Sequence, residues 1–230
     1  MIGLYDYTVW LTYLSALSAG AGIVITLTGF SHPYVGILFL MICGLCDAFD
    51  GRVARRKKNR TQMEKRYGIQ IDSLSDLIAF GVLPVCIGHG LAVLSPNYQV
   101  VWDKPFPKSI NTITVFFMAI MLWYILAALI RLAYYNVAEE ERQESEDGKK
   151  VTYTGLPVTS AAIVFPIIAL LQYILVQDIT LVYFVVMLMM SVAFVSRISI
   201  PKPGLKLILI LCGIGLVEFI FLIVYMLKVP

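Results

Sequence analysis

Four aspartates occur as two closely spaced pairs within the first third of the 230-residue chain. Asp47 and Asp50 are three positions apart, and Asp72 and Asp76 are four positions apart. At these spacings the two side chains of each pair lie on one face of a helix, one turn from each other. Ligation entirely by oxygen suits Mg²⁺, Mn²⁺ or Ca²⁺ rather than Zn²⁺. The four carboxylates therefore predict a site for one or two divalent cations, an arrangement that supports displacement at phosphorus.

An alternative use of these carboxylates is ion pairing with the basic residues nearby. Eight arginines and lysines lie between Arg52 and Arg66. Ion pairing, however, requires no particular spacing of the aspartates. Ionisable groups at membrane depth are costly and normally mark a functional site, so we favour the metal site.

The composition places these aspartates in a membrane protein. Hydrophobic residues make up 59% of the chain and charged residues only 14%, whereas a soluble domain is about half apolar and about a quarter charged. Seven stretches are long and apolar enough to span a bilayer: 10–30, 34–54, 70–94, 110–135, 156–176, 178–197 and 205–228. We expect an all-α integral membrane bundle of six to seven transmembrane helices, forming a single domain over 1–230. Its core lies at about 10–176, with additional carboxy-terminal spans over 178–228.

The basic residues predict which side of the membrane holds the aspartates. Of the 18 lysines and arginines, 15 lie with the connections that follow spans 2, 4 and 6. Basic residues remain on the cytoplasmic side, so the active site is expected at the cytoplasmic ends of spans 2 and 3. On a count of seven spans we expect the amino terminus outside. An amphipathic first segment on the cytoplasmic surface would instead place it inside, and the sequence leaves this open.

Small and basic residues follow the first aspartate pair. Gly51 and Ala54 could let a bulky ligand such as a nucleotide diphosphate approach the backbone, or they could let another helix pack closely. Arg52 and Arg55 lie within about one helical turn of the aspartates.

These residues resemble the signature of the CDP-alcohol phosphotransferases. The chain reads D-A-F-D-G-R-V-A-R from position 47, then a spacer of twelve residues, then G-I-Q-I-D-S-L-S-D from position 68. The family pattern is D-x-x-D-G-x-x-A-R followed by G-x-x-x-D-x-x-x-D, and all eight fixed letters are present. The spacer is longer than usual. With R-L-A-Y-Y-N at 131–136 and Y-T-G-L-P-V-T-S-A-A at 153–162, the chain looks most like the members that use L-serine. Where relatives often carry an asparagine in the first span, this chain has Ser15.

The resemblance implies transfer of a phosphatidyl group from CDP-diacylglycerol to the hydroxyl of L-serine, with release of CMP. It implies two divalent cations, Mg²⁺ or Mn²⁺, as cofactors. Matched position by position, it assigns a set of roles: metal binding to Asp47, Asp50, Asp72 and Asp76, proton abstraction from serine to Asp76, and contacts to the nucleotide and its phosphates to Gly51, Ala54, Arg55 and Thr61.

A serine acceptor also needs a group that binds its carboxylate, for which arginine is suited. Arg131 ends span 4, and Asn136 follows it just over one turn later. We take these two residues as candidates for acceptor binding. Arg131 could instead anchor the helix at the membrane surface or pair with one of the nearby glutamates.

Two rival functions stay open at this point. A sister enzyme would use another acceptor, such as glycerol 3-phosphate or inositol phosphate, and a cation transporter would also carry intramembrane carboxylates. The expected partners are CDP-diacylglycerol, L-serine and membrane lipid, with no nucleic acid, and a homodimer is left open. We expect a multi-pass protein of a prokaryotic cell membrane.

Overall fold

The structure is a computed structural model that describes residues 3–97, 112–144, 152–175 and 178–201, together with residues 213, 216, 217, 219–221, 223 and 224. Seven α-helices account for most of these residues: α1 (Trp10–Leu27), α2 (Tyr34–Arg56), α3 (Gln62–Asp76), α4 (Leu83–Leu94), α5 (Thr112–Glu144), α6 (Ala161–Leu175) and α7 (Thr180–Val195). Short helical turns lie at Tyr7–Val9 (η1) and Val158–Ser160 (η3), and a π-helix (η2) lies at Leu77–Val82. The strands β1 (Thr152–Thr154) and β2 (Ser199–Pro201) pair antiparallel.

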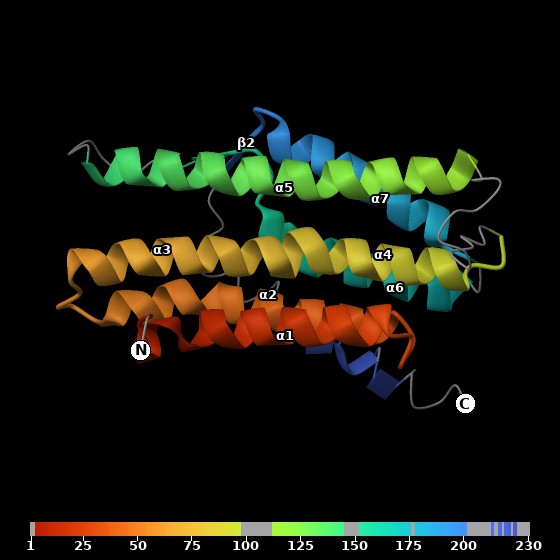
Figure 1. Ribbon diagram of the computed structural model, residues 1–230, viewed down its shortest axis with the longest axis horizontal. Helices are drawn as coiled ribbons and strands as arrows, with labels where there is room; N and C mark the ends of the chain where they lie inside the picture. Colours follow the sequence, from red (N-terminus) through yellow and green to blue (C-terminus); the bar gives the residue numbers. More distant parts are fainter. Residues whose placement is uncertain are drawn as a thin grey trace.

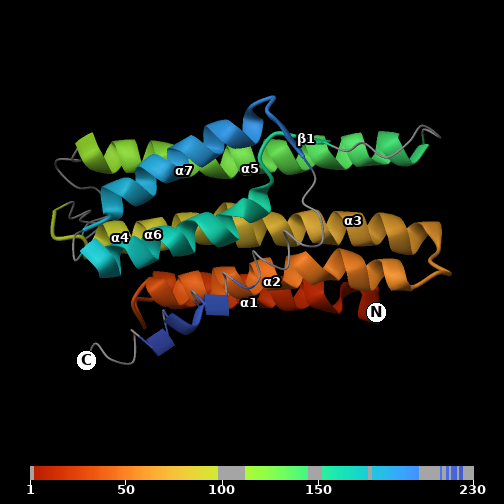
Figure 2. The ribbon, with the colours of Figure 1, turned by 180° about the vertical axis from the view of Figure 1, so that it is seen from behind.

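The expected helical membrane class is confirmed. Among the described residues, four helical stretches are long and apolar enough to cross a bilayer: Tyr7–Leu27, Tyr34–Arg56, Gln62–Leu94 and Thr112–Ala138. Two shorter apolar helices, Val158–Leu171 and Thr180–Val195, accompany them. They correspond to the expected spans at 156–176 and 178–197, and they are separate helices. The seventh expected span, at 205–228, lies largely outside the described residues. The long helices run nearly parallel to one another (Figures 1 and 2).

The connection between the two aspartate pairs is much shorter than the sequence suggested. Helix α2 continues to Arg56, and α3 already begins at Gln62. Thr61 caps α3, because its side chain accepts a hydrogen bond from the backbone N–H of Glu64, whose carboxylate accepts one from the backbone N–H of Thr61. This reciprocal capping satisfies backbone groups that have no partner within the helix. Most of the predicted spacer is therefore helical, and α2 and α3 form a tight helical hairpin.

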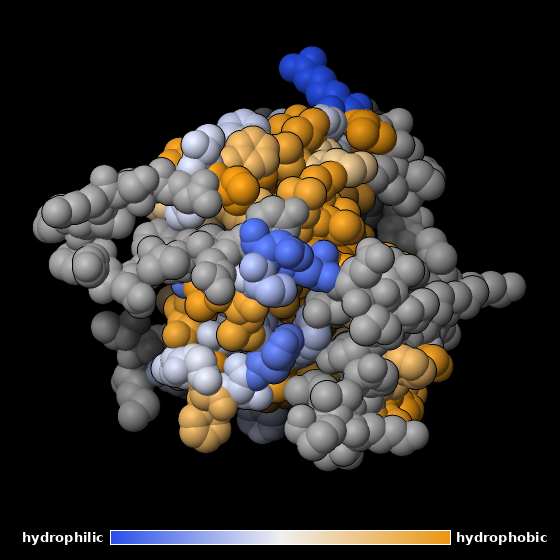
Figure 3. All heavy atoms as spheres, turned by 90° about the vertical axis from the view of Figure 1, so that its right-hand side faces the viewer, coloured by the Kyte–Doolittle hydropathy of each residue, from blue (hydrophilic) through white to orange (hydrophobic). Residues whose placement is uncertain are grey.

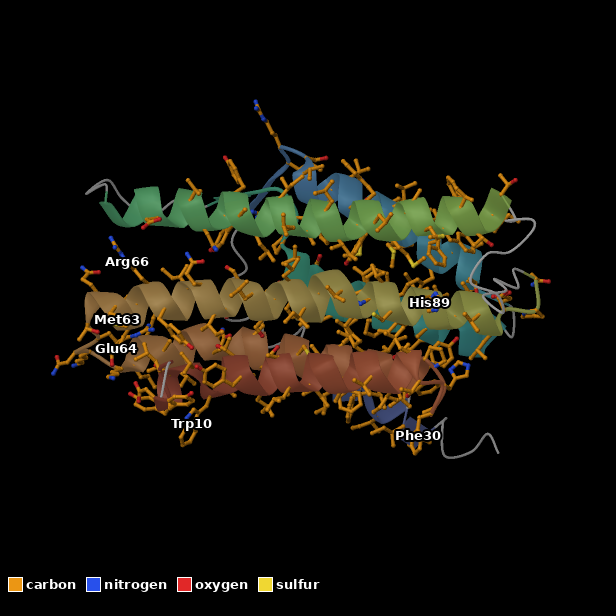
Figure 4. All side chains as sticks on the ribbon, viewed as in Figure 1. Trp10, Phe30, Met63, Glu64, Arg66 and His89 are labelled. Atoms are coloured by element: carbon orange, nitrogen blue, oxygen red, sulfur yellow. The ribbon has the colours of Figure 1, made fainter. Side chains whose placement is uncertain are left out.

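The amino terminus lies on the same side of the bundle as this hairpin, so the expected combination of an outside amino terminus with a cytoplasmic hairpin does not fit the structure. The carboxylate of Asp6 lies 2.8 Å from the ammonium of Lys57, directly after α2. The hydroxyls of Tyr13 and Tyr67 lie 2.8 Å apart, joining α1 to α3. Two successive crossings, α1 and α2, return the chain to the side on which it started. Figure 4 shows the same order, with Trp10, Met63, Glu64 and Arg66 at one end of the bundle and Phe30 and His89 at the other.

Helices α3, η2 and α4 form one continuous rod of 33 residues from Gln62 to Leu94. At 1.5 Å per residue it is about 50 Å long, which exceeds a bilayer core of about 30 Å. The rod is π-helical directly after Asp76, and Pro84 follows two residues after that stretch. A proline has no N–H to donate, and the carbonyl of Phe80, four residues before Pro84, instead accepts a hydrogen bond from the hydroxyl of Tyr124 on α5 (3.0 Å).

The core lies between α2, the α3–α4 rod, α5, α6 and α7. Aromatic rings fill it near α7: Phe117 stacks on Phe184 with 3.9 Å between ring centroids, and Tyr183 stacks on Phe165. Cys43 and Cys46 are buried in α2, and Cys43 belongs to the core. Seen from the end that carries Phe30, the described surface is mostly apolar around a small hydrophilic group (Figure 3).

Candidate metal centre and substrate pocket

Three of the four aspartates converge, two from α2 and one from α3. One carboxylate oxygen from each of Asp47, Asp50 and Asp72 lies within 4.8 Å of the other two. Asp50 is buried, and the other two are half-buried. Three carboxylates this close repel one another unless protons or cations intervene. A set of carboxylate oxygens is the donor set that hard divalent cations prefer, so these residues fit the predicted metal site.

Asp76 lies outside that group of three but opens into the same pocket. It is the last residue of α3, one helical turn after Asp72, and it is 9% exposed. Together with Asp47 and Asp72 it lines a pocket of about 580 Å³. The structure therefore separates a carboxylate trio from a fourth carboxylate that faces the same space.

Helix α1 contributes a contact that the sequence did not reveal. The hydroxyl of Thr12 donates a long hydrogen bond to the carboxylate of Asp50 (3.5 Å), and both residues are buried. The hydroxyl of Ser75 donates to the backbone carbonyl of Thr12 (3.1 Å). Thr12 is thus held between α2 and α3. A single threonine in an apolar span does not by itself indicate a functional residue. The contact with Asp50 is evident only once α1, α2 and α3 are packed together.

The pocket has a charged end and an apolar end. Arg52, Arg55 and Arg131 line its charged end, together with Asp47, Asp72 and Asp76. The guanidinium of Arg55 lies over Gly51, since a Cβ atom at Gly51 would be 3.2 Å from Nη1 of Arg55. Gly51 lines the pocket too, so the predicted neighbours Gly51 and Arg55 are brought to the carboxylates. Within the described residues, Ala54 and Thr61 are not part of this lining.

Arg131 is held at the wall of the pocket by contacts on several sides. It is 6% exposed, and its Nε donates to the carbonyl of Leu156 (3.2 Å). Its guanidinium lies over the ring of Tyr135, 5.5 Å from the centroid. Asn136 does not join it, because the amide oxygen of Asn136 accepts a hydrogen bond from the hydroxyl of Ser73 (2.7 Å). Asn136 therefore links α5 to α3 outside the pocket lining, and of the two predicted acceptor residues only Arg131 reaches the pocket.

Charges outside the pocket fasten the hairpin that carries the aspartates. The ammonium of Lys57 lies 2.8 Å from Asp6 and 2.7 Å from Glu64. Hydrogen bonds to these two carboxylates raise the pKa of Lys57, and the bond from Lys57 lowers the pKa of Asp6. Lys57 and Thr61 both serve the local structure of the α2–α3 connection here.

Comparison with known proteins identifies the family. The sequence pattern described as CDP-alcohol phosphatidyltransferase matches residues 8–197, which include all four aspartates, Arg55 and Arg131. The chain belongs to this family. No solved structure shows a significant match to the chain.

The relatives within the family are mostly named for serine. The chain is 32% identical over 162 residues to a CDP-diacylglycerol–serine O-phosphatidyltransferase of Saccharomyces cerevisiae, covering 67% of this chain and 50% of the relative. It is 27% identical over 197 residues to the protein of the same name from Helicobacter pylori, covering 81% of this chain and 72% of that relative. A CDP-diacylglycerol–inositol 3-phosphatidyltransferase of Candida albicans is 37% identical over 73 residues, covering 32% of this chain and 28% of the relative. The match thus spans about half the length of the yeast serine relative, and the relatives include both bacterial and yeast proteins.

Proposed function

We propose that this protein transfers the phosphatidyl group of CDP-diacylglycerol to the hydroxyl of L-serine, giving phosphatidylserine and CMP. The observation that carries the proposal is the carboxylate group of Asp47, Asp50 and Asp72 at a pocket that Asp47, Asp72 and Asp76 line together with three arginines and apolar side chains. Membership of the CDP-alcohol phosphatidyltransferase family supports the reaction class. The names of the yeast and Helicobacter relatives support serine as the acceptor.

The donor's pyrophosphate is expected at the charged end of the pocket. Asp47, Asp50 and Asp72 would hold one or two divalent cations, Mg²⁺ or Mn²⁺. When bound, such cations supply positive charge that neutralises the pyrophosphate and stabilises the departing CMP. Arg55, which lies over Gly51, adds a guanidinium that can donate paired hydrogen bonds to phosphate oxygens.

We assign the role of the base to Asp76. It lines the pocket without belonging to the carboxylate trio, so it can face the acceptor hydroxyl. Its carboxylate would take the proton of the serine hydroxyl while the serine oxygen forms a bond to the phosphorus of the phosphatidyl group. The bond from that phosphorus to the bridging oxygen breaks, and CMP leaves with the electron pair. A positioned base of this kind contributes about 10²- to 10⁴-fold to the rate.

Arg131 is our candidate for binding the serine carboxylate. The carbonyl of Leu156 and the ring of Tyr135 fix its guanidinium at the pocket wall. A fixed guanidinium can grip a carboxylate at small entropic cost. The cytoplasmic side suits this assignment, because serine would then come from the cytosol while the donor comes from the bilayer.

A sister reaction with another alcohol is the second candidate, favoured by the inositol-named relative from Candida. Phosphorylated acceptors such as glycerol 3-phosphate or inositol phosphate carry more negative charge and would want more cationic groups than Arg131 alone. Family membership gives no support to the alternative of a cation transporter.

An acceptor panel tests the proposal. Purified protein is given CDP-diacylglycerol, Mg²⁺ or Mn²⁺, and one of L-serine, glycerol 3-phosphate, inositol or inositol phosphate, and the release of CMP is measured. We expect release with serine and little with the others. Release with glycerol 3-phosphate or an inositol compound, but none with serine, would move the protein to the sister reaction.

A further inference from the structure

The apolar end of the pocket is a crevice that continues from the carboxylates along α2. One side comes from α2 and the other from α6. The apolar residues that line it from these two helices are Met41, Ile42, Leu45, Ala48, Ala162 and Ile163. All of them belong to helices with the length or composition of membrane-embedded segments. The crevice is therefore built to hold hydrocarbon rather than water.

Close contact between α2 and α6 forms the floor of this crevice. A Cβ atom placed at Gly44 would collide with the side chain of Ala162, and both residues line the pocket. The two helices thus touch at these small residues. Leu45 follows Gly44 on α2, and Ile163 follows Ala162 on α6. The larger side chains of Leu45 and Ile163 therefore form the walls beside this narrow floor.

A third wall comes from the carboxy-terminal part of the chain. Leu216 and Phe219 line the same pocket, and both lie beyond residue 197, where the family match ends. Phe219 is partly buried against the hydrophobic core, whereas Leu216 is 60% exposed. The described pieces of this part of the chain lie along the side of the bundle formed by α1 and α2 (Figures 1 and 2).

The two ends of one pocket define the chemistry of its occupant. The charged end requires an anionic headgroup, and the apolar end requires a tail that stays within the membrane-spanning part of the bundle. A free nucleotide would leave the crevice empty, and a neutral lipid would leave the arginines and carboxylates unmatched. The occupant that satisfies both ends is an anionic lipid with its phosphates at the arginines.

We propose that a hydrocarbon chain of the donor lipid lies in the crevice between α2 and α6, and that Leu216 and Phe219 form its third wall. Leu216 and Phe219, which lie beyond the residues matched by the family, then make the affinity for the donor depend on the length of its acyl chains. This inference rests on the proposed function for the identity of the headgroup.

Substitution of Phe219 tests the wall. Initial rates are measured with CDP-dioleoylglycerol and with CDP-dihexanoylglycerol for Phe219→Ala and for Leu216→Trp, which adds bulk at an exposed position. Phe221→Ala is the matched control, since Phe221 is 50% exposed in the same segment and is not part of the pocket lining. We expect Phe219→Ala to raise the KM for the dioleoyl donor about five- to tenfold, by loss of apolar contact, and to change the KM for the dihexanoyl donor less than about twofold.

Leu216→Trp should raise the KM for the long-chain donor selectively as well, and Phe221→Ala should match the wild type with both donors. Equal KM changes for the long and short donors, or a Phe219→Ala variant that behaves like Phe221→Ala, would overturn the inference.

A binding experiment separates this inference from the proposed function. A CDP-diacylglycerol analogue with a photoreactive diazirine on its acyl chain is crosslinked to the wild-type protein, and the labelled residues are mapped by mass spectrometry. We expect labelling at Leu216 or Phe219 that unlabelled CDP-dioleoylglycerol prevents. Such labelling supports the wall even if no acceptor releases CMP, in which case the proposed function alone fails. Labelling confined to other surfaces would contradict the wall even in an active enzyme.

Discussion

The carboxylate of Asp76 shares a pocket with Asp47 and Asp72, yet it lies outside the trio whose oxygens come within 4.8 Å of one another. The i,i+3 and i,i+4 spacings were enough to predict that each pair shares a helix face. They could not predict that Asp50 would turn towards Thr12 and away from the pocket lining. Contacts of this kind depend on how a third helix is rotated against the pair, which no local pattern in the sequence encodes.

Replacing Asp76 with asparagine tests its role as the base. Asn keeps the size of the side chain but cannot take a proton at neutral pH, so kcat should fall at least about 10²-fold. Donor binding, followed by thermal stabilisation with CDP-diacylglycerol, should persist. Asp178→Asn is the control, because Asp178 lies just before α7, at the opposite end of the bundle, and accepts a hydrogen bond from the N–H of Thr180 (2.9 Å). An unchanged kcat in Asp76→Asn would remove Asp76 as the base.

Thr12 is predicted to orient Asp50 for metal binding. Thr12→Val keeps the shape of the side chain and removes the hydroxyl, and loss of such an outer contact weakens metal binding by about tenfold or more. Calorimetric titration with Mn²⁺ measures the effect. Thr26→Val is the matched control, since Thr26 is an equally buried threonine of α1 whose hydroxyl donates to the carbonyl of Gly22 (2.7 Å). Equal Mn²⁺ affinity in the two variants would show that Thr12 has no part in the site.

At the scale of elements, the helical rod from Gln62 to Leu94 carries both Asp72 and Asp76. The sequence predicted a span at 70–94 from its apolar residues, but not the polar first turns of α3. Those turns extend beyond the apolar stretch and are fixed by the cap at Thr61 and the ion pairs of Lys57. The π-helix after Asp76 was also not predictable, because no local pattern in the sequence encodes it or the hydrogen bond that its residue Phe80 accepts from Tyr124 of α5.

Tyr124→Phe tests that support of the rod. Without the hydroxyl, the buried carbonyl of Phe80 loses the hydrogen bond from Tyr124, and the N–H-free Pro84 cannot replace it. An unsatisfied buried group of this kind costs about 1–3 kcal/mol, measured as a loss in the free energy of unfolding. Tyr134→Phe, at a tyrosine of the same helix that is 57% exposed, should change stability by less than about 0.5 kcal/mol. If both variants lose the same stability, the hydrogen bond to Phe80 does not support the rod.

For the whole molecule, composition alone predicted the membrane class, because a chain with 59% hydrophobic and 14% charged residues is more apolar than a soluble domain. The distribution of lysines and arginines predicts a cytoplasmic side for the connections, and an amino terminus on the opposite side from the α2–α3 hairpin does not fit the structure. The contacts of Asp6 with Lys57 and of Tyr13 with Tyr67 show that the amino-terminal segment packs on the α2–α3 hairpin. The two crossings predicted at 10–30 and 34–54 already imply this shared side, and the contacts agree with it.

A labelling experiment tests this topology. Single cysteines are introduced by Tyr5→Cys, Lys58→Cys and Phe30→Cys in a variant without the native cysteines, and a membrane-impermeant thiol reagent is added to sealed vesicles of known orientation. We expect the first two positions to react from one side, the cytoplasmic side by the distribution of basic residues. Phe30→Cys should react from the other side, as its position in Figure 4 indicates. Reaction of Tyr5→Cys and Lys58→Cys from opposite sides would contradict the fold.

The most direct test of the central claim is formation of phosphatidylserine by the purified protein in lipid vesicles that contain CDP-diacylglycerol. L-Serine is supplied with Mg²⁺ or Mn²⁺, and the lipid product and CMP are quantified together by mass spectrometry. The account predicts equal amounts of phosphatidylserine and CMP, and loss of both when a chelator removes the divalent cations. Absence of phosphatidylserine with either metal, or formation that continues undiminished in the chelator, would contradict it.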